Sequence, residues 1–216
     1  MDIGYWDSFY RDGGPNRLHA SFSEVVKGHF RTPGFLIEFG CGDGSDAVYF
    51  AESGWRVHAS DASVEGVKLA QRKKEKRGLG EKLVVLQCEV ATDTFPEEIG
   101  EALQEAGQSG IGVVFTRFFL HSLDDQELEG FVRNLAEAVP ASIFMAHEFR
   151  VPADENLSKL FSGHRRFFRT PQQVIEVFSR YFEVLTFSCV ESDSVAVFRE
   201  ENPVVGRLIC KIQRRE

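Results

Sequence analysis

Short apolar runs alternate with helix-like segments along most of the sequence from residue 35 onward. This alternation predicts an α/β fold with a parallel sheet, because parallel strands are joined through long crossovers that usually contain a helix. Such a sheet carries helices on both of its faces. The strands that we expect to be parallel are Phe35–Phe39, Arg56–Ser60, Leu83–Gln87, Val113–Thr116 and Ile143–Glu148.

The pattern changes near the end of the sequence. Two further strand-like runs, Phe182–Cys189 and Val195–Arg199, are separated by a short polar turn around Ser192. A turn of this length joins antiparallel neighbours, so we expect five parallel strands followed by a C-terminal antiparallel hairpin. No repeat or linker interrupts the chain, which predicts a single domain over residues 1–216 with the sheet core in residues 32–200.

Two of the expected helices carry clear start signals. The pairs Asp124–Glu127 and Thr170–Gln173 each have the spacing of a capping box, whose side chains bind backbone N–H groups at a helix start. Residues 1–31 are also expected to be helical, because one set of apolar side chains falls on a single helix face. That set consists of Leu18, Phe22, Val25, Val26 and Phe30.

The chain of 216 residues has a formal net charge of −8, and acidic proteins repel phosphate backbones. Its dense basic run, residues 72–77, is expected to close a helix before Gly78, where cations suit the negative end of the helix dipole. We therefore expect no nucleic-acid partner.

Neither a signal peptide nor an apolar run of membrane-spanning length is visible in the sequence. The four cysteines stand singly and show no spacing typical of a zinc site. We therefore expect a cytoplasmic protein with no membrane partner and no bound metal.

A glycine-rich segment, residues 38–46 with the sequence EFGCGDGSD, lies between the first expected strand and the first helix. Glycines there allow a sharp turn and a close approach of the backbone to a ligand. The first strand-to-helix junction of an α/β sheet is also where nucleotides bind. The segment therefore predicts a site for a nucleotide-like ligand.

Two details argue against a dinucleotide. The dinucleotide fingerprint has a glycine five residues after the first, where this chain has Ser45. An acid, Glu38, also stands two residues before the first glycine. Asp61, at the end of the second expected strand, can accept hydrogen bonds from both hydroxyls of a ribose. Glu89, at the end of the third, can accept a bond from an adenine amino group.

These residues resemble the motifs of the class I S-adenosylmethionine-dependent methyltransferases over about residues 30–200. Glu38–Gly44 match the first motif, Asp61 the ribose acid, and Glu89 stands where the family more often has Asp. The resemblance implies a Rossmann-like seven-stranded sheet, with S-adenosylmethionine as cofactor and S-adenosylhomocysteine as product. The residues then expected at the cofactor are Glu38, Gly40, Cys41, Gly42, Gly44, Asp61, Ala62, Glu89, Val90, Arg117, Tyr5 and Trp6.

The aromatic segment at residues 5–10, together with Thr116–His121, resembles a narrower bacterial group of that class. Its members modify small molecules in sugar, polysaccharide or natural-product pathways. In that resemblance the N-terminal residues 1–31 form a helical lid over the cofactor. Simple packing of Trp6 and Tyr10 against the sheet is the alternative.

After the fourth expected strand, the sequence lacks the Asn/Asp-Pro-Pro-aromatic segment that is usual in methyltransferases acting on nucleobases or glutamine. Arg117 and His121 stand there instead, and we expect both to be catalytic, His121 as a base. A structural role at the entry to the next helix is the alternative for His121.

Arginines near the predicted cleft suggest an anionic acceptor, because guanidinium groups bind phosphate and carboxylate bidentately. Ordinary surface pairs with Glu and Asp are the alternative. Residues 150–170 are expected to form a loop that covers the substrate. The residues expected at the acceptor are Tyr10, Arg117, His121, Glu148, Arg150, His164, Arg165 and Arg166.

Several functions stay open at this point. The favoured one is O-methylation of a small molecule, either an anion such as a phosphonate, phosphate ester or carboxylate, or a sugar hydroxyl. The alternatives are N-methylation of an amino sugar or other small amine, cofactor binding without catalysis, and a nicotinamide-dependent oxidoreductase. The oligomeric state is also open.

Overall fold

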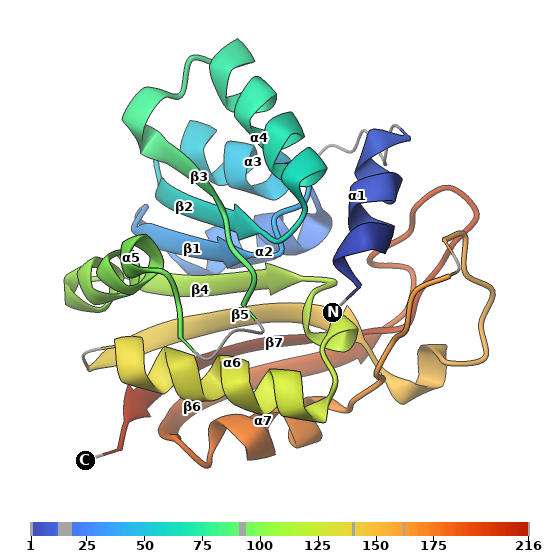
Figure 1. Ribbon diagram of the computed structural model, residues 1–216. Coiled ribbons are helices and arrows are strands. Elements are labelled where there is room, and N and C mark those ends of the chain that lie inside the picture. Colours follow the sequence, from blue (N-terminus) through green and yellow to red (C-terminus); the bar gives the residue numbers. More distant parts are fainter. Residues whose placement is uncertain (1, 13–18, 91–93, 140, 162, 216) are drawn as a thin grey trace.

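In the computed structural model, which describes residues 2–12, 19–90, 94–139, 141–161 and 163–215, seven strands form one sheet in the order β3-β2-β1-β4-β5-β7-β6. Strands β1 to β5 are parallel, and β7 is antiparallel to both β5 and β6 (Figure 1). The predicted seven-stranded sheet is confirmed. The strands are β1 (Phe35–Phe39), β2 (Arg56–Asp61), β3 (Leu83–Gln87), β4 (Gly112–Arg117), β5 (Ser142–Arg150), β6 (Phe182–Ser192) and β7 (Val205–Arg214).

Helices cover both faces of the sheet, as predicted, and two apolar cores result. Alternate side chains of β1 point to opposite faces: Ile37 and Phe39 lie in one core, and Leu36 lies in the other. Helices α2 (Ser21–His29), α3 (Ser45–Glu52) and α4 (Val64–Lys76) pack on the Leu36 side. Helices α5 (Glu97–Gln108), α6 (Asp125–Ala138) and α7 (Pro171–Phe178) pack on the other side.

Both predicted capping boxes are present. Asp124 accepts the backbone N–H of Glu127 at the start of α6, and the Glu127 side chain accepts the N–H of Asp124. Thr170 and Gln173 exchange the same pair of bonds at the start of α7. Because these caps set where the two helices begin, they also set the ends of the loops that precede them.

The strand predicted at Val195–Arg199 is wrong. These residues lie in the long loop between β6 and β7, and the side chain of Val197 is 55% exposed. The seventh strand is Val205–Arg214, where Leu208, Cys210 and Ile212 alternate and are buried. Because β7 lies between β5 and β6, it buries more apolar surface than the earlier run would, and the sheet ends near residue 214 rather than 200.

The N-terminal region holds two helices among its described residues, α1 (Ile3–Arg11) and α2. Phe22, Val26 and Phe30 face the core as predicted, but Val25 is 47% exposed and does not share that face. Leu18 lies outside the described residues. Helix α1 buries none of its residues fully and stands beside the carboxyl ends of the parallel strands, against α4 (Figure 1).

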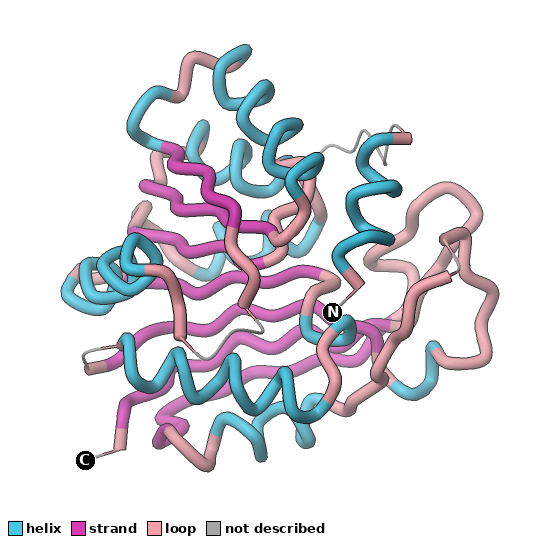
Figure 2. The backbone as a smooth tube through the Cα atoms, viewed as in Figure 1, coloured by secondary structure: helices cyan, strands magenta, loops and turns pink. Residues whose placement is uncertain are grey.

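Two long loops lie together at that same end of the sheet (Figure 2). One follows β5 and contains a short 3-10 helix at Pro152–Asp154, and the other joins β6 to β7. Phe161 of the first loop stacks on Phe198 of the second, at a ring-centroid distance of 6.2 Å. Among the described residues, the helices are all too short or too polar to cross a bilayer.

Candidate active site

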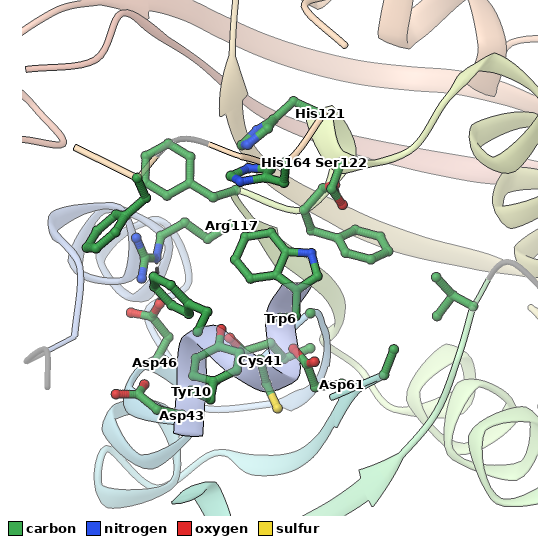
Figure 3. Close-up of a pocket in the computed structure, with 18 of the residues that line it drawn as sticks. Trp6, Tyr10, Cys41, Asp43, Asp46, Asp61, Arg117, His121, Ser122 and His164 are labelled. Atoms are coloured by element: carbon green, nitrogen blue, oxygen red, sulfur yellow. Dashed lines mark hydrogen bonds and ion pairs between the residues drawn. The ribbon is translucent and has the colours of Figure 1, made fainter. Parts of the chain in front are cut away.

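A cavity of about 140 Å³ opens at the carboxyl ends of β1, β2 and β4, where the strand order reverses between β1 and β4. This switch point is where open α/β sheets bind their ligands. Figure 3 shows Trp6 reaching toward the middle of the cavity, with His121 and His164 on one side and Asp61 on the other. The predicted site residues that line it are Trp6, Tyr10, Glu38, Gly40, Cys41, Asp61, Ala62, Val90, Arg117, His121, Arg150, His164 and Arg166.

The glycine loop adopts backbone angles that favour glycine. Gly40, Gly42 and Gly44 have φ values of +71°, +54° and +73°, in the left-handed region that side chains make costly. A Cβ atom on Gly42 would lie 2.1 Å from the hydroxyl of Tyr10. Although Gly42 and Gly44 do not line the cavity themselves, they give the loop the shape that its neighbours need.

Asp61 holds this loop from the end of β2. Its two carboxyl oxygens accept backbone N–H bonds from Gly42 and Ser63, both at 2.8 Å. Burial raises the pKa of Asp61 to about 6, although the two N–H bonds act to lower it. Each oxygen keeps a lone pair for a further donor, so the carboxylate can bind ribose hydroxyls from the position that the sequence predicts.

Glu38 and Arg117 lie buried at the back of the cavity. Burial, reinforced by the charge of Asp46, raises the pKa of Glu38 well above its usual range, and its Oε2 has no hydrogen-bond partner among the described residues. Arg117 donates from Nε to Asp46 (2.6 Å), which also accepts from Ser23 Oγ (2.6 Å). Arg117 is therefore neutralised inside the protein, and the Asp46 pair fixes α2 to the site.

Cys88 and Val90, which follow β3, line the cavity. Glu89 lies between them in the sequence but is exposed and does not line the cavity. Successive side chains of an extended segment point in opposite directions, which explains why Glu89 faces away while its two neighbours face inward. An adenine contact from the Glu89 side chain stays a prediction.

Helix α1 forms one wall of the cavity through Trp6, Phe9 and Tyr10. Tyr5 does not line the cavity, but its ring lies 4.7 Å from that of His164. Asp7 joins α1 to the start of α4, because it accepts from Ser63 Oγ (2.6 Å) and from the backbone N–H of Glu65 (3.3 Å). The helix is therefore held across the site by one carboxylate and a group of aromatic rings.

The arginines predicted at the acceptor differ in their environments. Arg150 is buried and forms ion pairs with Asp154 (2.6 Å) and with Glu201. Arg166 lines the cavity, and no carboxylate of the described residues lies within ion-pair distance of it. Arg165 is exposed and lines a separate hollow instead, and its guanidinium lies 5.1 Å from the Phe167 ring. Among these three described arginines, Arg166 is therefore the one that lines the cavity without an ion-pair partner.

Glu148 was expected beside the acceptor, but it lies outside the cavity lining. It is fully buried and accepts from Nε of Arg207 at 2.7 Å. Arg207 lies opposite Glu148 on β7, and Oε1 of Glu148 has no hydrogen-bond partner among the described residues. A contact of Glu148 with the substrate stays a prediction.

His121 is held in one tautomer. The backbone N–H of Arg150 donates to its Nδ1 (3.4 Å), so the ring proton of the neutral imidazole lies on Nε2. Burial, and then the charge of Arg150, hold the pKa of His121 well below its usual range. In this arrangement Nε2 is a hydrogen-bond donor, which does not favour the predicted role of His121 as a base.

Nine of the described residues that line the cavity were not among the predicted site residues, and three of these show what the sequence analysis missed. Asp46 and Glu201 neutralise Arg117 and Arg150, and Phe161 adds an aromatic wall from the loop after β5. Asp46 is the last residue of the glycine-rich segment, so its position in that motif could have marked it as a site residue in the sequence. Glu201 is 51 residues from Arg150 and carries no local signal.

Residues 37–141 match the sequence profile of a family described as a methyltransferase domain. The matched segment contains the glycine loop, Asp61 and the end of β4 with Arg117 and His121. No curated protein sequence matches the chain at a significant level.

Solved structures share the whole fold. One, described by the conversion of a disulfide bond into a thioacetal group during echinomycin biosynthesis, is 16% identical with a TM-score of 0.73, covering 99% of this chain and 92% of that one. A SAM-dependent methyltransferase from Anabaena variabilis ATCC 29413 is 16% identical with a TM-score of 0.69, covering 100% and 96%. The glycopeptide N-methyltransferase MtfA complexed with sinefungin is 14% identical with a TM-score of 0.66, covering 96% and 91%.

The matched profile, the sheet and the site at its switch point indicate an S-adenosylmethionine-dependent methyltransferase. Its cofactor is S-adenosylmethionine. The residues present fit that molecule. Asp61 lines the cavity as a ribose acceptor, and Glu38 keeps an oxygen that is unpartnered among the described residues and can bind a cationic amino group.

Proposed function

We propose that this methyltransferase transfers a methyl group to an oxygen of a small anionic molecule that carries a carboxylate, phosphate or phosphonate group. One observation carries the proposal: the guanidinium of Arg166 faces the cavity without a carboxylate partner among the described residues. Its Nε is buried without a hydrogen bond, and its Nη2 donates to the carbonyl of Phe161.

An anionic ligand would relieve two unfavourable features of Arg166. A buried donor without a partner costs about 1–3 kcal/mol, and more when the group is charged. Burial, and then the neighbouring charge of Arg150, lower the pKa of Arg166. Arg150 is already neutralised by Asp154 and Glu201, so a carboxylate or phosphate in the cavity would pair mainly with Arg166.

An anionic acceptor also suits a site whose histidine is a donor. S-adenosylmethionine, when bound, supplies a methyl group on a positively charged sulfur, and alignment of the acceptor behind that carbon can contribute about 7–11 kcal/mol. A carboxylate or phosphonate oxygen has no proton to lose before it reacts. The Nε2–H of His121 can orient such an oxygen, whereas a sugar hydroxyl would need a base that this tautomer does not provide.

The test is an assay of S-adenosylhomocysteine release with a panel of carboxylates, phosphonates, neutral sugars and small amines. We expect turnover with anionic acceptors, and the variant Arg166→Gln should raise KM about 10- to 100-fold, as the loss of a charged hydrogen bond predicts. Arg165→Gln is the matched control, because Arg165 lies outside the cavity, and should leave KM unchanged.

Other results would contradict the proposal. Turnover with amines alone would make the protein an N-methyltransferase, and turnover with neutral sugars alone would remove the anionic group. No release with any acceptor, despite tight cofactor binding, would favour a binding protein without catalysis. Equal KM values for the Arg166 and Arg165 variants would show that Arg166 does not bind the acceptor.

A further inference from the structure

The acceptor side of the cavity is walled by aromatic rings from two separate segments. Trp6 and Phe9 come from α1, and Phe161 comes from the loop after β5. Phe9 packs edge-to-face on Phe161, with ring centroids 4.9 Å apart at 88°, and on Trp6 at 5.5 Å and 85°. Three aromatic side chains gathered on one wall favour a ligand with an aromatic body, because each ring pair contributes about 0.5–1.5 kcal/mol beyond its buried area.

Most of the polar groups on this side are already engaged. Glu201 binds Arg150 and accepts the backbone N–H of Leu160 at 3.2 Å. Ser122 donates its hydroxyl to the carbonyl of Phe119 at 2.7 Å. A polyhydroxylated body such as a sugar would therefore find few free partners here, and each buried hydroxyl without one would weaken its binding.

Two polar side chains of the same loop keep nitrogen atoms without a hydrogen bond among the described residues. Both ring nitrogens of His164 are buried without a hydrogen bond among the described residues, and so is Nε of Arg166. Burial, and then the charge of Arg166, lower the pKa of His164 to about 4, so its ring is neutral near pH 7. This side of the cavity thus offers one positive charge and one neutral polar ring among aromatic walls.

We infer that the acceptor is a small aromatic anion, with its anionic group on Arg166 and its ring against the wall formed by Trp6, Phe9 and Phe161. The anionic group follows from the proposed function, while the aromatic body is a separate conclusion from the walls and from the engaged polar groups. The structure favours this class over sugar phosphates, which share the anionic group but carry hydroxyls.

The experiment is calorimetric titration of protein saturated with S-adenosylhomocysteine, using four probes. Benzoate has both features, benzamide lacks the charge, cyclohexanecarboxylate lacks the planar ring, and glucose 6-phosphate is an anion with a sugar body. We expect benzoate to bind about 10- to 100-fold more tightly than benzamide, because a charged hydrogen bond is lost. Its preference over cyclohexanecarboxylate should be about two- to tenfold, the range of one or two aromatic contacts.

Variants separate the two features. Arg166→Gln should abolish the preference for benzoate over benzamide, and Arg165→Gln should keep it. Phe161→Leu should abolish the preference for benzoate over cyclohexanecarboxylate but keep the preference over benzamide. Phe198→Leu is its control, because Phe198 stacks on Phe161 but does not line the cavity. Circular dichroism and unchanged S-adenosylhomocysteine affinity show that each variant is folded.

The inference is overturned if glucose 6-phosphate or cyclohexanecarboxylate binds as tightly as benzoate, or if none of the probes binds at millimolar concentration. It is also overturned if Phe161→Leu changes no preference. A different result would contradict the proposed function but support the aromatic site. In that result benzoate binds with the expected preferences, but methyl transfer occurs only to neutral acceptors or amines. The two failures are therefore distinguishable.

Discussion

Replacement of Asp61 by Asn tests the cofactor site through its dependence on pH. The carboxyl group accepts N–H bonds from Gly42 and Ser63, and burial raises its pKa to about 6. An ionised Asp61 can also accept both ribose hydroxyls, whereas Asn offers one oxygen and turns an NH₂ group toward donors. Since a charged hydrogen bond contributes about 1.5–3 kcal/mol, we expect Asp61→Asn to weaken S-adenosylhomocysteine binding by about 10- to 150-fold at pH 7.5.

The pH dependence should differ between the two proteins. Cofactor binding favours the ionised carboxylate, so wild-type affinity should fall as the pH drops below about 6, by up to about tenfold for one pH unit. Asp61→Asn should show no such fall. Calorimetric titrations between pH 5 and pH 7.5 measure both values, and a flat wild-type profile or an equal slope in the variant would refute the assignment of Asp61.

The stability of the cofactor-free protein gives a second measure with the opposite sign. The folded pKa of Asp61 lies above the unfolded value of 3.8, so protonation favours the folded state. The stabilisation is complete below pH 3.8 and is lost as the pH rises through about 6, where the ionised group costs about 3 kcal/mol. The wild-type protein should therefore lose stability between pH 5 and pH 7, whereas Asp61→Asn should not. Urea denaturation of both proteins over this pH range measures the difference in their unfolding free energies.

Three further substitutions test other parts of the site. Gly42→Val should reduce S-adenosylhomocysteine affinity below detection in a protein that circular dichroism shows to be folded, because its Cβ would lie 2.1 Å from the Tyr10 hydroxyl at φ +54°; normal binding would refute the loop assignment. Asp7→Asn should speed hydrogen exchange in α1, since Ser63 and Glu65 lose their charged acceptor; exchange as slow as in wild type would contradict that role. Asp154→Ala should lower the unfolding free energy by about 3–5 kcal/mol, because Arg150 loses a buried partner. Asp125→Asn removes an exposed carboxylate from an ion pair with Arg169 and should lower the unfolding free energy by less than about 1 kcal/mol. Equal losses in the Asp154 and Asp125 variants would contradict the importance of the buried pair.

The sequence predicts the features of the fold that depend on neighbouring residues. The first strand has the predicted limits, Phe35–Phe39, because all five residues are buried between the two cores. The capping boxes of α6 and α7 are also local, each contained within four residues. Helix α5 lacks a side-chain cap, so only the spacing of its apolar residues, such as Ile99 and Leu103, marks it in the sequence.

Long-range pairing decides the features that the sequence does not predict. The run Val195–Arg199 has the apolar content of a strand, but only the sheet determines that Val205–Arg214 occupies the place between β5 and β6. Arg150 and Arg166 are equally basic in the sequence, and their difference depends on Glu201. The role of His121 changes for the same reason, because its Nδ1 binds a backbone N–H 29 residues away.

The interior position of β7 has a consequence for the order in which the molecule can fold. Strand β7 comes last in the sequence, yet it pairs with β5 and β6 on its two sides. Until it is synthesised, β5 is an open edge whose unpaired backbone groups can join another chain. The segment before β7 also supplies the N–H of Val204 to Asp154 and the carboxylate of Glu201 to Arg150. The part of the cavity around Arg150 can therefore be completed only after the glycine loop and Asp61 have formed with the earlier strands, and nascent chains are exposed to aggregation during that interval.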